Sequence, residues 1–109
     1  MDVKTTSIVL GEYNADGCPP DQTFVDVISD AAGCNLINNA GINNVVVIPK
    51  PDMPATCILT LFGDKNCQSS TNARIGPITP ASHPSACIGP IRGGSAGAIF
   101  EAKSATLVC

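Results

Sequence analysis

The chain has 109 residues, with nine acidic and six basic side chains and a net charge of −3. A chain of this length forms one domain with a modest core, and its scattered basic residues exclude the clustered patch that nucleic-acid binding needs. No apolar run approaches the roughly 18 residues of a membrane-spanning helix. We therefore expect a single domain over residues 1–109 that binds no nucleic acid and spans no membrane, with residues 1–4 as a disordered or added N-terminus.

Six cysteines are the strongest signal in the sequence: Cys18, Cys34, Cys57, Cys67, Cys87 and Cys109. An even number in so small a chain predicts three disulfides and an oxidising compartment. Zinc binding is disfavoured, because zinc sites use closely spaced cysteine pairs or nearby histidines, and here the closest pair is Cys57 and Cys67 and the only histidine is His83. The pairing stays open at this point, although Cys109 is expected to tie the C-terminus to another element. No apolar leader follows Met1, so we interpret the chain as the mature form of a secreted protein.

The first third of the chain predicts one strand and one helix. The β-branched, apolar run Thr5–Leu10 is typical of a strand. Asp21–Ala32 has the pattern of a helix, because Asp21 follows two prolines as an N-cap and Gly33 is placed to end it. Its apolar side chains recur at helical spacing and form one stripe, which we expect to pack on a sheet: Phe24, Val27, Ile28 and Ala31.

The middle of the chain predicts strands separated by irregular segments. Val45–Ile48 is a fully apolar strand. Ala55–Cys67 contains the predicted central strand, covered on both sides, followed by a tight turn. Gln68–Pro90 is rich in proline and has no helical period, although a second helix within 68–95 stays open.

The C-terminal part completes the predicted fold. Ala96–Lys103 and Ala105–Cys109 predict one long bent strand or two short ones. Together, these elements predict an α+β fold, in which one main helix packs on an antiparallel β-sheet of four or five strands held by disulfides.

No catalytic or cofactor site stands out in the sequence. Gly93–Gly97 matches the G-x-S-x-G pattern of hydrolase nucleophiles, but a strand follows it where a helix is needed, and His83 precedes the serine. Pro77–Pro80 matches P-x-x-P, which we interpret as loop stiffening. We therefore predict a non-enzymatic protein with no cofactor and no metal. The candidate partner surface lies on and beside the proline-rich segment: Arg74, His83 and Arg92.

Two features resemble the small secreted cysteine-rich proteins of filamentous fungi. These are the strand and turn from Cys57 to Cys67, with its Asp-x-Asn-Cys ending, and the late strand Ala96–Cys109 that ends in cysteine. The resemblance implies a secreted effector or virulence protein, acting as a monomer that binds a host protein or cell surface. The alternative that it implies is an antimicrobial or killer-type toxin that acts on competing cells. One structural subgroup of these proteins implies a killer-toxin-like α/β sandwich.

Overall fold

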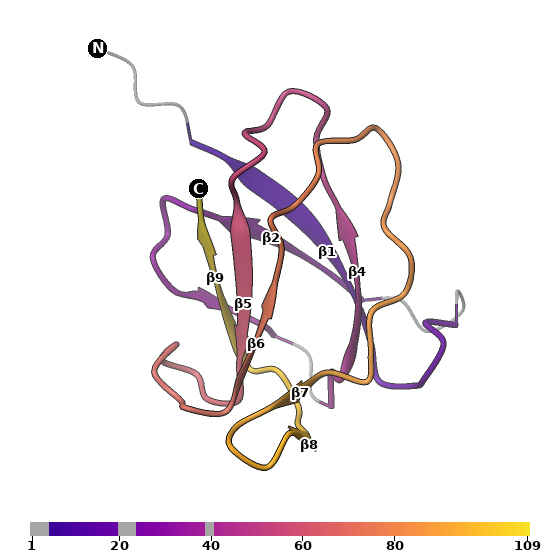
Figure 1. The fold of residues 1–109 in the computed structure, drawn as a ribbon, viewed down its shortest axis with the longest axis vertical. Coiled ribbons are helices and arrows are strands. Elements are labelled where there is room, and N and C mark those ends of the chain that lie inside the picture. Colours follow the sequence, from indigo (N-terminus) through magenta and orange to yellow (C-terminus); the bar gives the residue numbers. More distant parts are fainter. Residues whose placement is uncertain (1–4, 20–23, 39–40) are drawn as a thin grey trace.

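The computed structural model of the protein describes residues 5–19, 24–38 and 41–109 and is built from β-strands alone (Figure 1). No helix occurs in these residues, so none could span a membrane. The strands are β1 Ser7–Tyr13, β2 Phe24–Ser29, β3 Asn35–Leu36, β4 Asn44–Ile48, β5 Ile58–Phe62, β6 Asn72–Ile75, β7 Arg92–Gly93, β8 Ala98–Ile99 and β9 Ser104–Val108.

The strands form two main layers and one small hairpin, and every strand pair is antiparallel. The three-stranded sheet has the order β2-β1-β4, and the four-stranded sheet has the order β3-β9-β5-β6. Strands β7 and β8 make a separate hairpin, seen at the lower end of Figure 1. The fold is therefore a small β-sandwich with a hairpin at one end.

The core lies between the two sheets and is aliphatic. Alternate residues of each strand point to opposite faces of a sheet, so each strand contributes its inward set to one buried cluster. The three-stranded sheet contributes Ile8, Leu10, Ile28, Val45 and Val47, and the four-stranded sheet contributes Leu59, Leu61, Ala105 and Leu107. This composition follows from the scarcity of aromatic residues in the sequence.

The predicted helix over Asp21–Ala32 is wrong, and with it the α+β fold and the killer-toxin-like α/β sandwich. Its described part contains strand β2, which pairs with β1 from Phe24 opposite Glu12 to Ser29 opposite Ser7. Half of β2 is Val or Ile, and such β-branched side chains fit a pleated sheet better than a helix. An apolar stripe of two helical turns is too short to distinguish the spacing of a helix from the alternation of a strand. Asp21, the predicted N-cap, lies outside the described residues.

Other strand predictions are confirmed. Strand β1 covers most of Thr5–Leu10 and continues through Gly11 to Tyr13, while β4 and β5 coincide with the predicted apolar runs. The C-terminal part forms the short strands β8 and β9, and residues 68–95 contain β6 and β7 without a helix. Strand β5 is central in its sheet, but its outward residues Ile58 and Phe62 are half-buried, so only its inward face is fully covered.

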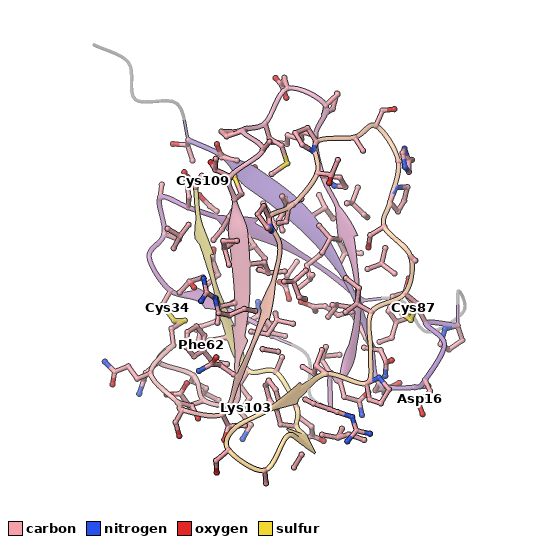
Figure 2. The ribbon with its side chains drawn as sticks, viewed as in Figure 1. Asp16, Cys34, Phe62, Cys87, Lys103 and Cys109 are labelled. Atoms are coloured by element: carbon pink, nitrogen blue, oxygen red, sulfur yellow. A yellow bond between two sulfur atoms is a disulfide. The ribbon has the colours of Figure 1, made fainter. Side chains whose placement is uncertain are left out.

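All six cysteines form disulfides, as predicted, with the pairs Cys18–Cys87, Cys34–Cys67 and Cys57–Cys109. The last pair joins the C-terminus to the start of β5. Figure 2 shows Cys34 and Cys87 on opposite sides of the sandwich. Each bridge stabilises a small domain by about 2–4 kcal/mol, largely by restricting the unfolded chain. Three disulfides in so small a protein are typical of extracellular proteins.

Candidate functional site

The outward side of the three-stranded sheet is an apolar surface, which we call the valine face: Val9, Val25, Val27, Val46 and Ile48. In the ladders, Val9 stands opposite Val27 on one side and Ile48 on the other, so these three side chains form one row across the sheet. Val25 and Val27 are 56% and 63% exposed. Neither sheet of the sandwich covers this face.

The second row across the valine face consists of Val25, Gly11 and Val46, and a tyrosine ring fills its centre. Gly11 stands between Val25 and Val46 in the ladders and has no side chain to fill its position. A Cβ atom at Gly11 would lie 3.6 Å from both Cε1 and Oη of Tyr13, so the ring lies over the glycine. Tyr13 is itself buried. The ring therefore fills the position between Val25 and Val46 that Gly11 leaves empty.

Polar groups border the valine face at its two ends. At one end, Lys50 Nζ donates a hydrogen bond to Ser7 Oγ at 2.9 Å. At the other, the exposed Asp16 accepts a hydrogen bond of 3.1 Å at Oδ1 from Nδ2 of Asn44, whose side chain is fully buried. An apolar centre with a polar rim is the usual anatomy of a protein–protein interface.

One edge of the three-stranded sheet is closed by the proline-rich segment. Val45 and Ile88 exchange two backbone hydrogen bonds of 2.9 and 2.8 Å. Val47 N donates to Ser85 Oγ at 2.9 Å, and Val47 O accepts from Ser85 N at 2.8 Å. Ile91 N donates to the carbonyl of Asn43. The outward backbone groups of β4 are therefore satisfied within the chain.

Along the opposite edge, described residues satisfy the outward backbone groups of β2 only at its end. Asp30 N donates to Thr6 O, so Asp30 and Thr6 form a hydrogen-bonded pair. Along an antiparallel ladder, hydrogen-bonded pairs alternate with pairs whose backbone groups point away from each other. Hence Val25, Val27 and Ser29 point their backbone N–H and C=O groups away from β1. The Ser29 groups bind the side-chain amide of Asn35, at 3.0 Å each. Within the described residues, no hydrogen bond reaches the outward groups of Val25 and Val27.

Asp26 is the one charged residue on this edge strand. It stands opposite Leu10 in the ladder and thus points to the same, inward side of the sheet. Its carboxylate accepts long hydrogen bonds of 3.4 Å from the backbone N–H and the side-chain amide of Asn38. An acidic side chain therefore stands between the two positions whose backbone groups point outward.

The proline-rich segment lines an apolar groove of about 340 Å³ beside β4 and the end of β6. Its walls include Val47, Ile75, Ile78 and Ile88, and His83 is its titratable lining residue. The P-x-x-P segment Pro77–Pro80 forms part of the same wall. Thr79 and Ser85 are the hydroxyl residues of its lining, and Ser85 Oγ accepts a hydrogen bond from Val47 N and donates one to Ala86 O.

The three residues of the predicted partner surface lie on different elements. Arg74 belongs to β6, opposite Thr60 on the outward side of the four-stranded sheet. His83 lines the groove, and Arg92 belongs to β7, where its Nη1 donates to Gly97 O at 3.4 Å. No hydrogen bond between described residues joins any two of them.

Two other sequence features take structural roles. The G-x-S-x-G segment is the exposed turn between β7 and β8, where Gly94 and Gly97 adopt positive φ and a hydrogen bond from Gly97 N to Gly94 O closes the turn. Among the described residues, no group of three or more His, Cys, Asp or Glu side chains is placed to hold a metal ion.

The valine face is the surface that the sequence interpretation missed. The alternation of Val25 and Val27 around Asp26 was the available signal, but it was assigned to a helix. Glu12 was missed as well: it is fully buried on the inward side of β1. Comparisons with protein families, with curated proteins and with solved structures found no match to this chain.

Proposed function

We propose that this protein is a secreted, cysteine-rich protein of effector type, which acts by binding a host protein or cell surface and not by catalysis. The observation that supports this proposal is the valine face. An exposed apolar surface rimmed by polar groups is characteristic of interaction sites. The resemblance to small secreted fungal proteins supports the same class of function.

The energetics favour a binding role for this face. Burying a valine side chain completely is worth about 1.5 kcal/mol or more, and Val25 and Val27 gain little of this in the free protein because they are mostly exposed. A partner that covers the face would therefore gain apolar contact area that the fold does not use.

The alternative, a toxin acting directly on membranes, has less support. Direct membrane activity usually needs a cationic amphipathic surface. Here the net charge is −3, and Lys50 is the cation hydrogen-bonded at the rim of the valine face. A killer-type toxin that binds a protein receptor on competing cells would use the same surface as an effector.

A pair of matched variants tests the proposal. Val27→Lys places a charge in the valine face, whereas Val108→Lys places one on β9 of the other sheet, where the native valine is similarly exposed, at 66%. The protein and both variants are infiltrated into plant tissue, and cell death or immune suppression is scored. In parallel, binding to extracellular fluid proteins is quantified by cross-linking.

The proposal expects that Val27→Lys lowers both readouts by about tenfold or more, as for a charge placed in an interface centre, and that Val108→Lys retains them. Equal activity of the two variants would contradict it. Leakage of dye from liposomes at the same concentrations would instead support direct membrane activity.

A further inference from the structure

We propose that the open edge of β2 is a strand-addition site: an extended segment of the partner protein pairs antiparallel with β2, and places a basic residue opposite Asp26. This inference rests on the proposed binding function and names the kind of partner segment that the same surface takes. It follows from the backbone groups of β2, from the charge of Asp26 and from the exposure of Val25 and Val27 on the valine face.

The backbone of β2 defines the occupant as a strand. Val25 and Val27 each direct an N–H and a C=O group outward, with the spacing of an antiparallel ladder. At Ser29, the next outward position, the amide of Asn35 already donates and accepts as a neighbouring strand would. On the far side of the sheet, the segment around Ser85 and Ile88 occupies the corresponding edge of β4.

A second copy of this chain is a less favourable occupant of the edge than a segment with a basic residue. The register that satisfies both free positions pairs Val25 of one copy with Val27 of the other, and Asp26 then stands directly opposite its own equivalent. Like charges directly opposite in a ladder are destabilising. An acidic residue pointing inward from an edge strand is also a known protection against pairing between copies.

The same charge selects the partner. In the added strand, the residue opposite Asp26 lies on the same side of the sheet as its carboxylate, and a lysine or arginine there forms a cross-strand pair with it. The residues on either side of this lysine or arginine lie opposite Val25 and Val27, on the valine face. Apolar residues at these two places extend both rows of the face by one strand. The occupant is thus an extended segment with the pattern apolar–basic–apolar.

Amide hydrogen exchange measured by NMR tests the proposal. The probes are two synthetic peptides of alternating valine and threonine that differ only in a central lysine or glutamate. In the free protein, the amides of Val25 and Val27 exchange fast, whereas those of Asp26 and Ile28, which point to β1, exchange slowly. The lysine peptide is expected to slow exchange at Val25 and Val27 by about tenfold or more, and to bind about fivefold more tightly than the glutamate peptide.

Three results would overturn the inference: unchanged exchange at Val25 and Val27 with saturating lysine peptide, equal affinity for the two peptides, or a dimer of the unmodified protein that protects these amides. The variant Val27→Pro removes one outward N–H while sparing the ladder to β1, because proline is tolerated where an edge N–H faces solvent. Its matched control, Val27→Thr, keeps the N–H and the branched side chain.

These variants also separate this inference from the proposed function. Val27→Pro is expected to lose both binding of the lysine peptide and partner capture, by which we mean cross-linking to extracellular fluid proteins. Val27→Thr is expected to keep both. If Val27→Lys abolishes partner capture but Val27→Pro retains it, the binding function stands and strand addition is wrong. If Val27→Lys itself has no effect, the proposed function fails.

Discussion

The side-chain amide of Asn35 occupies the place of a missing strand beside Ser29. Its Oδ1 accepts a hydrogen bond from Ser29 N, and its Nδ2 donates to Ser29 O, both at 3.0 Å. The same Nδ2 donates to Ala105 O of β9 at 3.2 Å. One buried side chain therefore connects the edge of the three-stranded sheet to the four-stranded sheet.

Replacing Asn35 by leucine should destabilise the protein by about 1–3 kcal/mol, because the half-buried backbone groups of Ser29 and the buried carbonyl of Ala105 lose the side-chain amide as a partner. Urea unfolding with the disulfides intact measures the change. The control is Asn38→Ala, since Asn38 is exposed and its hydrogen bonds to Asp26 are long, at 3.4 Å. The control should change the free energy of unfolding by less than about 0.5 kcal/mol. Equal effects of the two substitutions would contradict the role of Asn35.

Gly93→Ala should cost about 1–3 kcal/mol, because a Cβ atom at this position would overlap the backbone of Asn72 in β6. Gly63→Ala is the matched control. A Cβ there would meet its nearest neighbours, Phe100 and Thr71, at 3.5 Å, which is ordinary van der Waals contact. Thermal unfolding should show a lower midpoint for Gly93→Ala alone. An unchanged midpoint would mean that β7 is not packed against β6 as described.

The disulfides should be reduced in an order set by their burial. Both cysteines of the Cys34–Cys67 bridge are accessible, since Cys34 is exposed and Cys67 is half-buried, whereas in Cys57–Cys109 only Cys109 is exposed and Cys57 is fully buried. Because exchange requires access of a thiolate to a sulfur atom, mild reductant should open Cys34–Cys67 before Cys57–Cys109. Alkylation followed by peptide mass mapping measures the order. The peptide map of the protein before reduction must first show the three disulfide pairs described above. Any other pairing would contradict the fold.

Asp26→Asn should allow the protein to self-associate weakly, since it removes the like-charge contact that opposes pairing of β2 with a second copy. The contact is worth about 0.2–1 kcal/mol, so dimers should appear only at high protein concentration. Sedimentation velocity compares this variant with Asp52→Asn, which neutralises an exposed loop carboxylate and should stay monomeric. A monomeric Asp26→Asn variant would show that the charge does not control self-pairing.

Much of the sandwich could be predicted from local sequence. The runs around Ile8, Val47 and Leu61 are β-branched or aliphatic and too short for stable helices, so they predicted β1, β4 and β5. The error at β2 has a physical cause. Phe24, Val27 and Ile28 satisfy a helical stripe, while Val25, Val27 and Asp26 satisfy an alternation, and only pairing with β1 chooses between them.

The candidate site could not be predicted because it depends on which face of a sheet stays uncovered. Val9 and Val46 are β-branched aliphatic residues like the core residues Ile8 and Val47. The two pairs differ in the side of the sheet to which their side chains point. Which side faces the other sheet is decided by contacts between residues far apart in the chain.

By itself, the sequence determined an aliphatic core and three disulfides, because composition and cysteine number limit what can stabilise so small a chain. It also determined most of the strands, through β-branched side chains. Only the tertiary structure decided that β2 is a strand, which cysteines pair, and that one edge of the three-stranded sheet is closed while the described residues leave the other open. These outcomes depend on long-range antiparallel pairing, which satisfies backbone hydrogen bonds that no local pattern specifies.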